Sequence, residues 1–367
     1  MDKSSTIRPG SLDKNMTVTA LEGEWEWHSP KEKPMAVLGF AWLESEGLYR
    51  RLPAHPSETL PPAVDMLADC TAGGQIRFRT NASRIAVRAI LGGSPNMYHM
   101  PGTGQNGFDV YLGEPGEERY VGTVRFEPHQ AAYASLLVDG SPPEGLRTVT
   151  INFPLYQSVQ EVEVGLSPGA EVAEAVFPQP GRLVFYGTSI TQGGCASRPG
   201  MSYPQQIGRS LCREVINLGF SGNGKGEPEL ARIIREIERV DALVLDYESN
   251  CTLEGYLSTL EPFIRLYREK NPLTPILVST KIRYAKEAIQ PSLTELRIRK
   301  RDFAREVVER LTAEGDANLY WCDGGNHLGE RFDECTVDGV HPTDLGFARM
   351  AEGIGQHLAG ILGIVRK

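Results

Sequence analysis

A serine, an aspartate and a histidine occur in contexts suited to nucleophilic catalysis. Ser189 lies in a glycine-flanked turn after the short apolar run at 183–186, where a serine can project its hydroxyl from the end of a strand. Asp338 and His341 are three residues apart in a turn near the C-terminus. At this spacing the carboxylate can bond one imidazole nitrogen and leave the other free to accept a proton. The set predicts a serine nucleophile, a histidine base and an orienting acid, which together favour acyl transfer at an ester carbonyl.

Three groups are candidates for an oxyanion hole, which would stabilise the negative charge of a tetrahedral intermediate. They are the backbone N–H of Ser189, the N–H of Gly219 after the apolar run at 215–218, and the amide of Asn250 after the run at 242–246. Each group also has a conformational interpretation. The serine can cap a helix, the glycine can relax a tight turn, and the asparagine can form an Asx-turn.

Three further residues are candidates for substrate contact. Thr188 directly precedes the predicted nucleophile, and His99 lies in a polar and aromatic loop at 96–101. That loop could lean over the active site or bind sugar, or it could be an ordinary long loop. His327 has no carboxylate at Asp-x-x-His spacing, so we interpret it as a loop residue rather than the base, with substrate contact as the alternative.

The six cysteines are scattered through the chain and form no disulfide framework. Cys322, His327, Cys335 and His341 could in principle bind a metal, but they include no paired Cys-x-x-Cys. Cys195 lies near the predicted nucleophile without a histidine on its own turn, which favours a packing role. We therefore predict no metal and no cofactor.

Composition excludes several classes of protein. The chain has 367 residues, 40% hydrophobic and 23% charged, with a net charge of −9, which is ordinary for a globular protein and weighs against nucleic acid or an anionic membrane as a partner. No transmembrane run and no signal-peptide core are recognisable, which predicts a cytoplasmic protein. A small-molecule or carbohydrate ester is the expected partner. The oligomeric state is left open, with a homo-oligomer among the possibilities.

Two halves of the chain have different hydrophobic periods. After an N-terminal extension at 1–19, residues 20–168 carry short runs that alternate with period two, typical of an antiparallel β-sandwich. A proline- and glycine-containing linker at 169–180 precedes a catalytic domain at 181–367. There, buried runs alternate with amphipathic helices, which predicts a parallel sheet between helices. The predicted strands are 183–186, 215–218, 242–246, 276–279 and one around Leu319 and Trp321.

Taken together, these motifs resemble the SGNH branch of the GDSL hydrolases. The matching residues are Gly187-Thr188-Ser189-Ile190, Asn217-Leu218-Gly219, Asn250 and Asp338-x-x-His341. The first half resembles the β-sandwich that precedes the hydrolase domain in a subgroup of the family, through Gly47-Leu48-Tyr49-Arg50-Arg51-Leu52-Pro53, Gly107-Phe108-Asp109-Val110-Tyr111 and Pro154-Leu155-Tyr156.

The resemblance implies an α/β fold with a flavodoxin-like three-layer parallel sheet, preceded by a jelly-roll-like sandwich. Two positions depart from the family pattern. Thr188 replaces the usual aspartate before the serine, and Glu248-Ser249-Asn250-Cys251 replaces the usual Gly-x-Asn-Asp.

We expect a serine esterase that hydrolyses short acyl esters, most simply acetyl esters on a carbohydrate, through a Ser-His-Asp triad and an acyl-enzyme. An acyltransferase would use the same residues to move the acyl group to an acceptor hydroxyl. A non-catalytic carbohydrate-binding protein is a further alternative.

Overall fold

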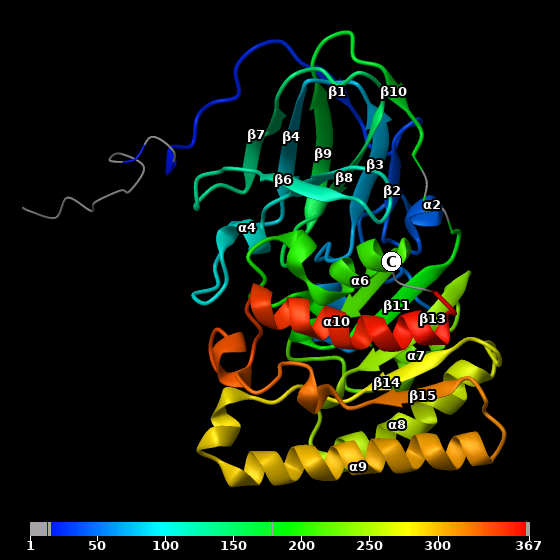
Figure 1. Ribbon diagram of the computed structural model, residues 1–367. Helices are drawn as coiled ribbons and strands as arrows, with labels where there is room; N and C mark the ends of the chain where they lie inside the picture. Colours follow the sequence, from blue (N-terminus) through cyan, green and yellow to red (C-terminus); the bar gives the residue numbers. More distant parts are fainter. Residues whose placement is uncertain (1–12, 14–15, 176, 178, 365–367) are drawn as a thin grey trace, which may run out of the picture.

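A computed structural model describes residues 13, 16–175, 177 and 179–364. Most of the predicted N-terminal extension therefore lies outside the described residues. Figure 1 shows an antiparallel sandwich above an α/β unit, with the final helix crossing the front of the latter. Between residues 16 and 175, and between 179 and 364, no helix is long and apolar enough to cross a membrane.

The N-terminal part consists of two packed antiparallel sheets. Alternate residues of the facing strands, such as Ile76 and Phe78 in one sheet and Ile85 and Val87 in the other, are fully buried in one core between them. The first sheet has the order β1 (Glu26–His28), β9 (Val159–Leu166), β4 (Arg84–Leu91), β7 (Ala132–Asp139). The second has the order β10 (Val172–Ala173), β3 (Gln75–Thr80), β8 (Arg147–Asn152), β5 (Asp109–Leu112), β6 (Arg119–Thr123), with β2 (Ala36–Leu38) paired to β3.

Three short helices interrupt the sandwich: α2 (Leu43–Glu46), α3 (Pro62–Ala68) and α4 (Gly102–Gln105). Val64 and Ala68 of α3 are fully buried in the hydrophobic core of the α/β unit rather than in the core of the sandwich. The two halves thus share a core. The predicted linker at 169–180 includes β10, which pairs with β3 of the sandwich. We retain a division into two domains within this segment as a proposal.

The second half forms a five-stranded parallel sheet, as expected from its apolar runs. Its order is β12 (Glu214–Gly219), β11 (Arg182–Gly187), β13 (Val240–Asp246), β14 (Ile276–Ser279), β15 (Leu319–Cys322). Written by position in the chain this order is 2-1-3-4-5, the flavodoxin-like arrangement. The fold class expected from the sequence is confirmed.

Helices cover both faces of this sheet. Alternate strand residues enter two separate cores: Phe185 and Val244 pack with α6 (Tyr203–Leu211) and α10 (Asp344–Ile361). Tyr186 and Leu245 pack on the other face with α7 (Pro228–Ile234), α8 (Leu253–Arg268) and α9 (Pro291–Ala313). Short 3-10 turns complete the unit: η2 (Pro199–Met201), η3 (Glu248–Asn250), η4 (Ala285–Ala288), η5 (Gly324–Asn326) and η6 (Phe332–Cys335).

The strand order reverses at β11, because β12 pairs with one edge of it and β13 with the other. Loops that leave two neighbouring strands there turn to opposite faces and open a crevice at the carboxyl ends. Ser189 follows β11 and Asn250 follows β13, so the fold brings both loops to this crevice.

Candidate active site

The serine begins a short helix directly after the central strand. In α5 (Ser189–Gln192), Thr188 is the N-cap, and its hydroxyl accepts the N–H of Ile190 at 3.3 Å. Thr188 is only 1% exposed. The structure therefore gives Thr188 a capping role and does not support the predicted substrate contact. Capping holds Ser189 in the first turn of α5, directly after the carboxyl end of β11.

A continuous chain of hydrogen bonds joins the three predicted catalytic side chains. Ser189 Oγ lies 2.9 Å from His341 Nε2, and His341 Nδ1 lies 2.8 Å from Asp338 Oδ2. The other carboxylate oxygen, Oδ1, accepts the backbone N–H groups of His341 at 2.8 Å and Val340 at 3.0 Å. The turn around Asp338 thus fixes both the backbone and the ring of His341.

The charge of Asp338 follows from these bonds. Burial by itself would raise the pKa of this carboxyl, but the hydrogen bonds from His341 and Val340 outweigh burial and lower the pKa to about 2. The ionised carboxylate can only accept at neutral pH, so it holds a proton on Nδ1 of His341. Nε2 is then the unprotonated nitrogen and can accept the proton of Ser189.

The structure does not support Gly219 as an oxyanion donor. Its N–H donates to Asn217 Oδ1 at 2.9 Å, and the residue is buried where β12 packs against α5. A Cβ placed on Gly219 would lie 2.1 Å from the backbone nitrogen of Gln192, so close packing explains the glycine. The N–H of Ser189, in contrast, donates to no other described residue and stays available.

Asn250 lies at the crevice, but its amide is turned toward the loop that follows β12. Nδ2 donates to the carbonyl oxygens of Asn223 and, at 3.4 Å, Phe220. Gly222, between these two residues, has a φ of 66° and an N–H that donates to no described residue. In this arrangement the amide of Asn250 holds the loop, in which the N–H of Gly222 has no described acceptor.

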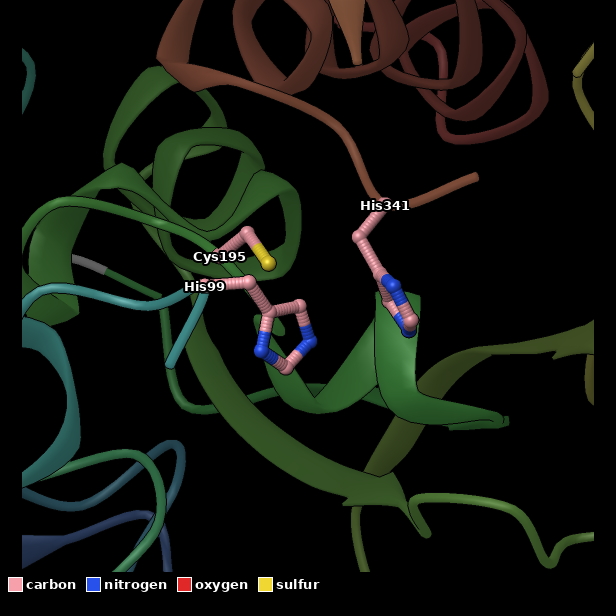
Figure 2. Close-up of side chains that lie close together, drawn as sticks. All are labelled: His99, Cys195 and His341. Atoms are coloured by element: carbon pink, nitrogen blue, oxygen red, sulfur yellow. The ribbon is translucent and has the colours of Figure 1, made fainter. Parts of the chain in front are cut away.

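His99 reaches the site from the sandwich, in the loop between β4 and α4. Its Nε2 lies 4.0 Å from Asp338 Oδ2, and its ring packs edge-on against the ring of His341 with centroids 5.4 Å apart (Figure 2). The exposed ring of Tyr98 stacks on it at 4.5 Å. The loop at 96–101 of the N-terminal part therefore places Tyr98 and His99 beside His341. This arrangement agrees with the possibility that the loop leans over the active site.

His327 is not part of this arrangement. It fills the space beside Gly353 of α10, where an added Cβ would lie 2.2 Å from its Nδ1. Burial first, and then His357, lower the pKa of His327 to about 4. A neutral histidine packed on a helix is a structural residue, so neither the predicted substrate contact nor the rival role as base is supported.

The structure does not bring together the possible metal ligands considered from the sequence, which were Cys322, His327, Cys335 and His341. Among the residues that the structure describes, the one group with converging metal-ligand atoms is His99, Cys195 and His341. Burial first, and then the charge of Asp338, raise the pKa of Cys195 to about 12, so its thiol is protonated at neutral pH and is no rival nucleophile.

Comparison with known families matches residues 181–359 to a model described as the GDSL-like lipase/acylhydrolase family. Residues 25–172 match a model described as the N-terminus of Esterase_SGNH_hydro-type. A crystal structure from Bacteroides ovatus, described as a GDSL-like lipase, is 31% identical with a TM-score of 0.86, and the match covers 94% of this chain and 100% of that chain. The chain belongs to the GDSL-like lipase/acylhydrolase family. A comparison with curated proteins found no match.

Two more distant structures share the fold of this GDSL family member. The salicylyl-acyltransferase SsfX3 from a tetracycline biosynthetic pathway is 23% identical with a TM-score of 0.75, covering 93% of this chain and 98% of that chain. An acetyl xylan esterase from the rumen bacterium Butyrivibrio proteoclasticus is 12% identical with a TM-score of 0.57, covering 93% and 99%.

Two buried residues support the site in this GDSL protein, although the sequence patterns assign neither of them a role. Arg51, in the first family-like motif, donates to backbone carbonyls on both sides of the junction between the halves. Gln192 accepts the N–H of Ser221 at 3.1 Å and donates to Leu155 O at 3.1 Å, which ties the loop after β12 to the sandwich. The carbonyls bound by Arg51 are those of Leu67, Cys70, Asn217 and Gly219.

Proposed function

We propose that the protein is a serine esterase with Ser189 as nucleophile, His341 as general base and Asp338 as orienting acid. The observation that carries the proposal is the unbroken chain from Ser189 Oγ through His341 to the ionised Asp338. A serine hydroxyl is a weak nucleophile until an adjacent base takes its proton. Here that base is His341, whose Nε2 lies 2.9 Å from the serine hydroxyl. Asp338 fixes the tautomer of His341 through the bond to Nδ1.

In this mechanism Ser189 Oγ attacks the ester carbonyl as its proton passes to His341 Nε2. The resulting imidazolium is stabilised by Asp338 and gives the proton to the leaving alkoxide, which releases the alcohol. Water then attacks the acyl-enzyme by the same route and releases the acid. Negative charge on the tetrahedral intermediate would be met by the N–H of Ser189 and, in place of Gly219, by the free N–H of Gly222. Asn250 would serve either by holding that loop or by turning its amide to the oxyanion.

We further propose a short acyl group, most simply acetyl, on a carbohydrate. The supporting feature is the rim supplied by the sandwich. Tyr98 is 93% exposed and stacks on His99 beside His341, and an exposed aromatic face next to polar groups suits the apolar face of a sugar ring. Fold neighbours described as a family two carbohydrate esterase and an acetyl xylan esterase are consistent with this substrate class.

The test is hydrolysis of p-nitrophenyl acetate and of acetylated xylan by wild type and Ser189→Ala. The variant should lose at least about a thousand-fold in kcat, because it removes the hydroxyl that is hydrogen-bonded to His341 Nε2. Ser258→Ala removes a hydroxyl that bonds within α8 and serves as the matched control, with unchanged turnover. Near wild-type turnover in Ser189→Ala would refute the mechanism. Product analysis with an added sugar acceptor separates hydrolysis from acyl transfer.

A further inference from the structure

Three metal-ligand side chains from separate parts of the chain converge beside the catalytic serine. His99 comes from the sandwich loop, Cys195 from the segment after α5 and His341 from the loop before α10. One ligand atom from each lies within 4.8 Å of the other two. Figure 2 shows the thiol and the two imidazole rings gathered around one space.

Neither His99 nor Cys195 has a hydrogen-bonding role that would explain this placement. His99 Nδ1 is buried without a partner among the described residues, and Nε2 is 4.0 Å from Asp338 Oδ2, beyond hydrogen-bond distance. Cys195 is 4% exposed and has a φ of 75°, a left-handed conformation that is unfavourable for a non-glycine residue. The esterase mechanism uses neither side chain.

The donor set selects the kind of cation. Two imidazole nitrogens and one sulfur suit a thiophilic divalent ion such as Zn²⁺, whereas Mg²⁺ and Ca²⁺ prefer oxygen ligands. His341 also has the second partner that zinc-bound histidines usually need, since its Nδ1 bonds the carboxylate of Asp338 at 2.8 Å. With bonds of about 2.0–2.3 Å, tetrahedral ligand atoms lie about 3.3–3.8 Å apart. Closing the group from 4.8 Å requires side-chain movements of about 1 Å.

We propose that His99, Cys195 and His341 form a Zn²⁺ site that inhibits the enzyme reversibly. On binding, the thiol of Cys195 releases its proton to solvent and coordinates as thiolate, and each imidazole coordinates through an unprotonated nitrogen. The fourth position is left to water. Binding through Nε2 of His341 occupies the nitrogen that would take the proton of Ser189, so the metal and the serine compete for one atom.

Metal binding itself is independent of the proposed function, whereas inhibition rests on the role proposed for His341. Two readouts separate these parts. Binding is measured by titrating full-length Ser189→Ala with Co²⁺ and recording the thiolate-to-cobalt charge-transfer absorption. Inhibition is measured by titrating wild type with ZnCl₂ during p-nitrophenyl acetate hydrolysis, followed by rescue with EDTA.

Cys195→Ser is the decisive variant, and Cys212→Ser is its matched control. Cys212 is also a free thiol at a left-handed φ, 53°, and it does not belong to the converging group. We expect Cys195→Ser to keep its metal-free activity and to need at least about ten-fold more Zn²⁺ for half inhibition. The same substitution in Ser189→Ala should abolish the cobalt band. Cys212→Ser should behave as wild type in both assays.

The outcomes decide between the alternatives. No cobalt band in Ser189→Ala, or equal zinc sensitivity in wild type and Cys195→Ser, would overturn the site. If the cobalt band depends on Cys195 but the wild-type protein has no esterase activity, the metal site is supported and the proposed function is refuted.

Discussion

The substitution Asp338→Asn isolates the contribution of tautomer control to catalysis. Asparagine has nearly the same shape, and its oxygen can still accept the backbone N–H groups of Val340 and His341 that now bond Oδ1 at 3.0 and 2.8 Å. Its NH₂ group then faces Nδ1 of His341 and can only donate. Nδ1 must therefore become the acceptor, which places the ring proton on Nε2, opposite Ser189 Oγ. A protonated Nε2 cannot take the serine proton.

The expected loss is set by two contributions. The bond of 2.8 Å between Nδ1 and the ionised carboxylate is charge-assisted, and such bonds contribute about 1.5–3 kcal/mol. The reversed tautomer adds the cost of restoring the reactive form before each turnover, and the same substitution in a serine protease triad lowers kcat by about 10⁴. We expect kcat to fall by about 10³ to 10⁴, which corresponds to about 4 to 5.5 kcal/mol in the activation barrier.

Steady-state hydrolysis of p-nitrophenyl acetate near neutral pH measures this loss, and thermal unfolding checks that the variant is folded. Asp333→Asn makes the same chemical change at a half-exposed residue of the same loop region, whose contact with Arg331 is 4.0 Å, and should keep full activity. If Asp338→Asn retains more than about a tenth of wild-type kcat, the carboxylate does not control the tautomer, and the proposed role of Asp338 is wrong.

Three other substitutions test the supporting structure. Arg51→Met leaves four carbonyl groups at the junction without their donor and should lower the free energy of unfolding by about 2–4 kcal/mol in urea titrations; unchanged stability would contradict a structural role for the guanidinium. Burial raises the pKa of Asp246 to about 7, so the contribution of this carboxyl to stability falls as pH rises from about 4 to about 7, and wild type minus Asp246→Asn should show that slope in melting temperatures. The pKa of His327, lowered to about 4 by burial, gives a contribution of opposite sign, which is lost as pH falls from about 6.5 through about 4. His327→Gln should flatten this loss and keep turnover within about three-fold, whereas an inactive, folded variant would return His327 to the list of candidate bases.

Local patterns were sufficient for the fold and for the three side chains that meet at the candidate site. Five buried apolar runs separated by helices predict a parallel sheet, because both faces of such a strand must be covered. Ser189 is placed by the end of its strand, and the spacing of Asp338 and His341 lets one turn join them. These features depend on neighbours in the chain, so the sequence alone carries them.

Backbone groups were harder to predict, because every residue carries an N–H and only the three-dimensional fold decides its partner. Gly219 is the last residue of β12, and Gly222 lies in the loop that follows it. The N–H of Gly219 donates to Asn217 Oδ1, whereas that of Gly222 donates to no described residue.

Contacts between the halves depend on tertiary structure alone. Arg51 and His99 are distant in the sequence from the residues that they approach, and no local pattern links His99 to Cys195 or His341. The sequence by itself determined the sandwich, the parallel sheet and the Ser189, Asp338 and His341 motifs, through period and spacing. Only the docking of the sandwich on the sheet decided which nitrogen, thiol and amide groups surround the serine, because long-range packing brings those groups together.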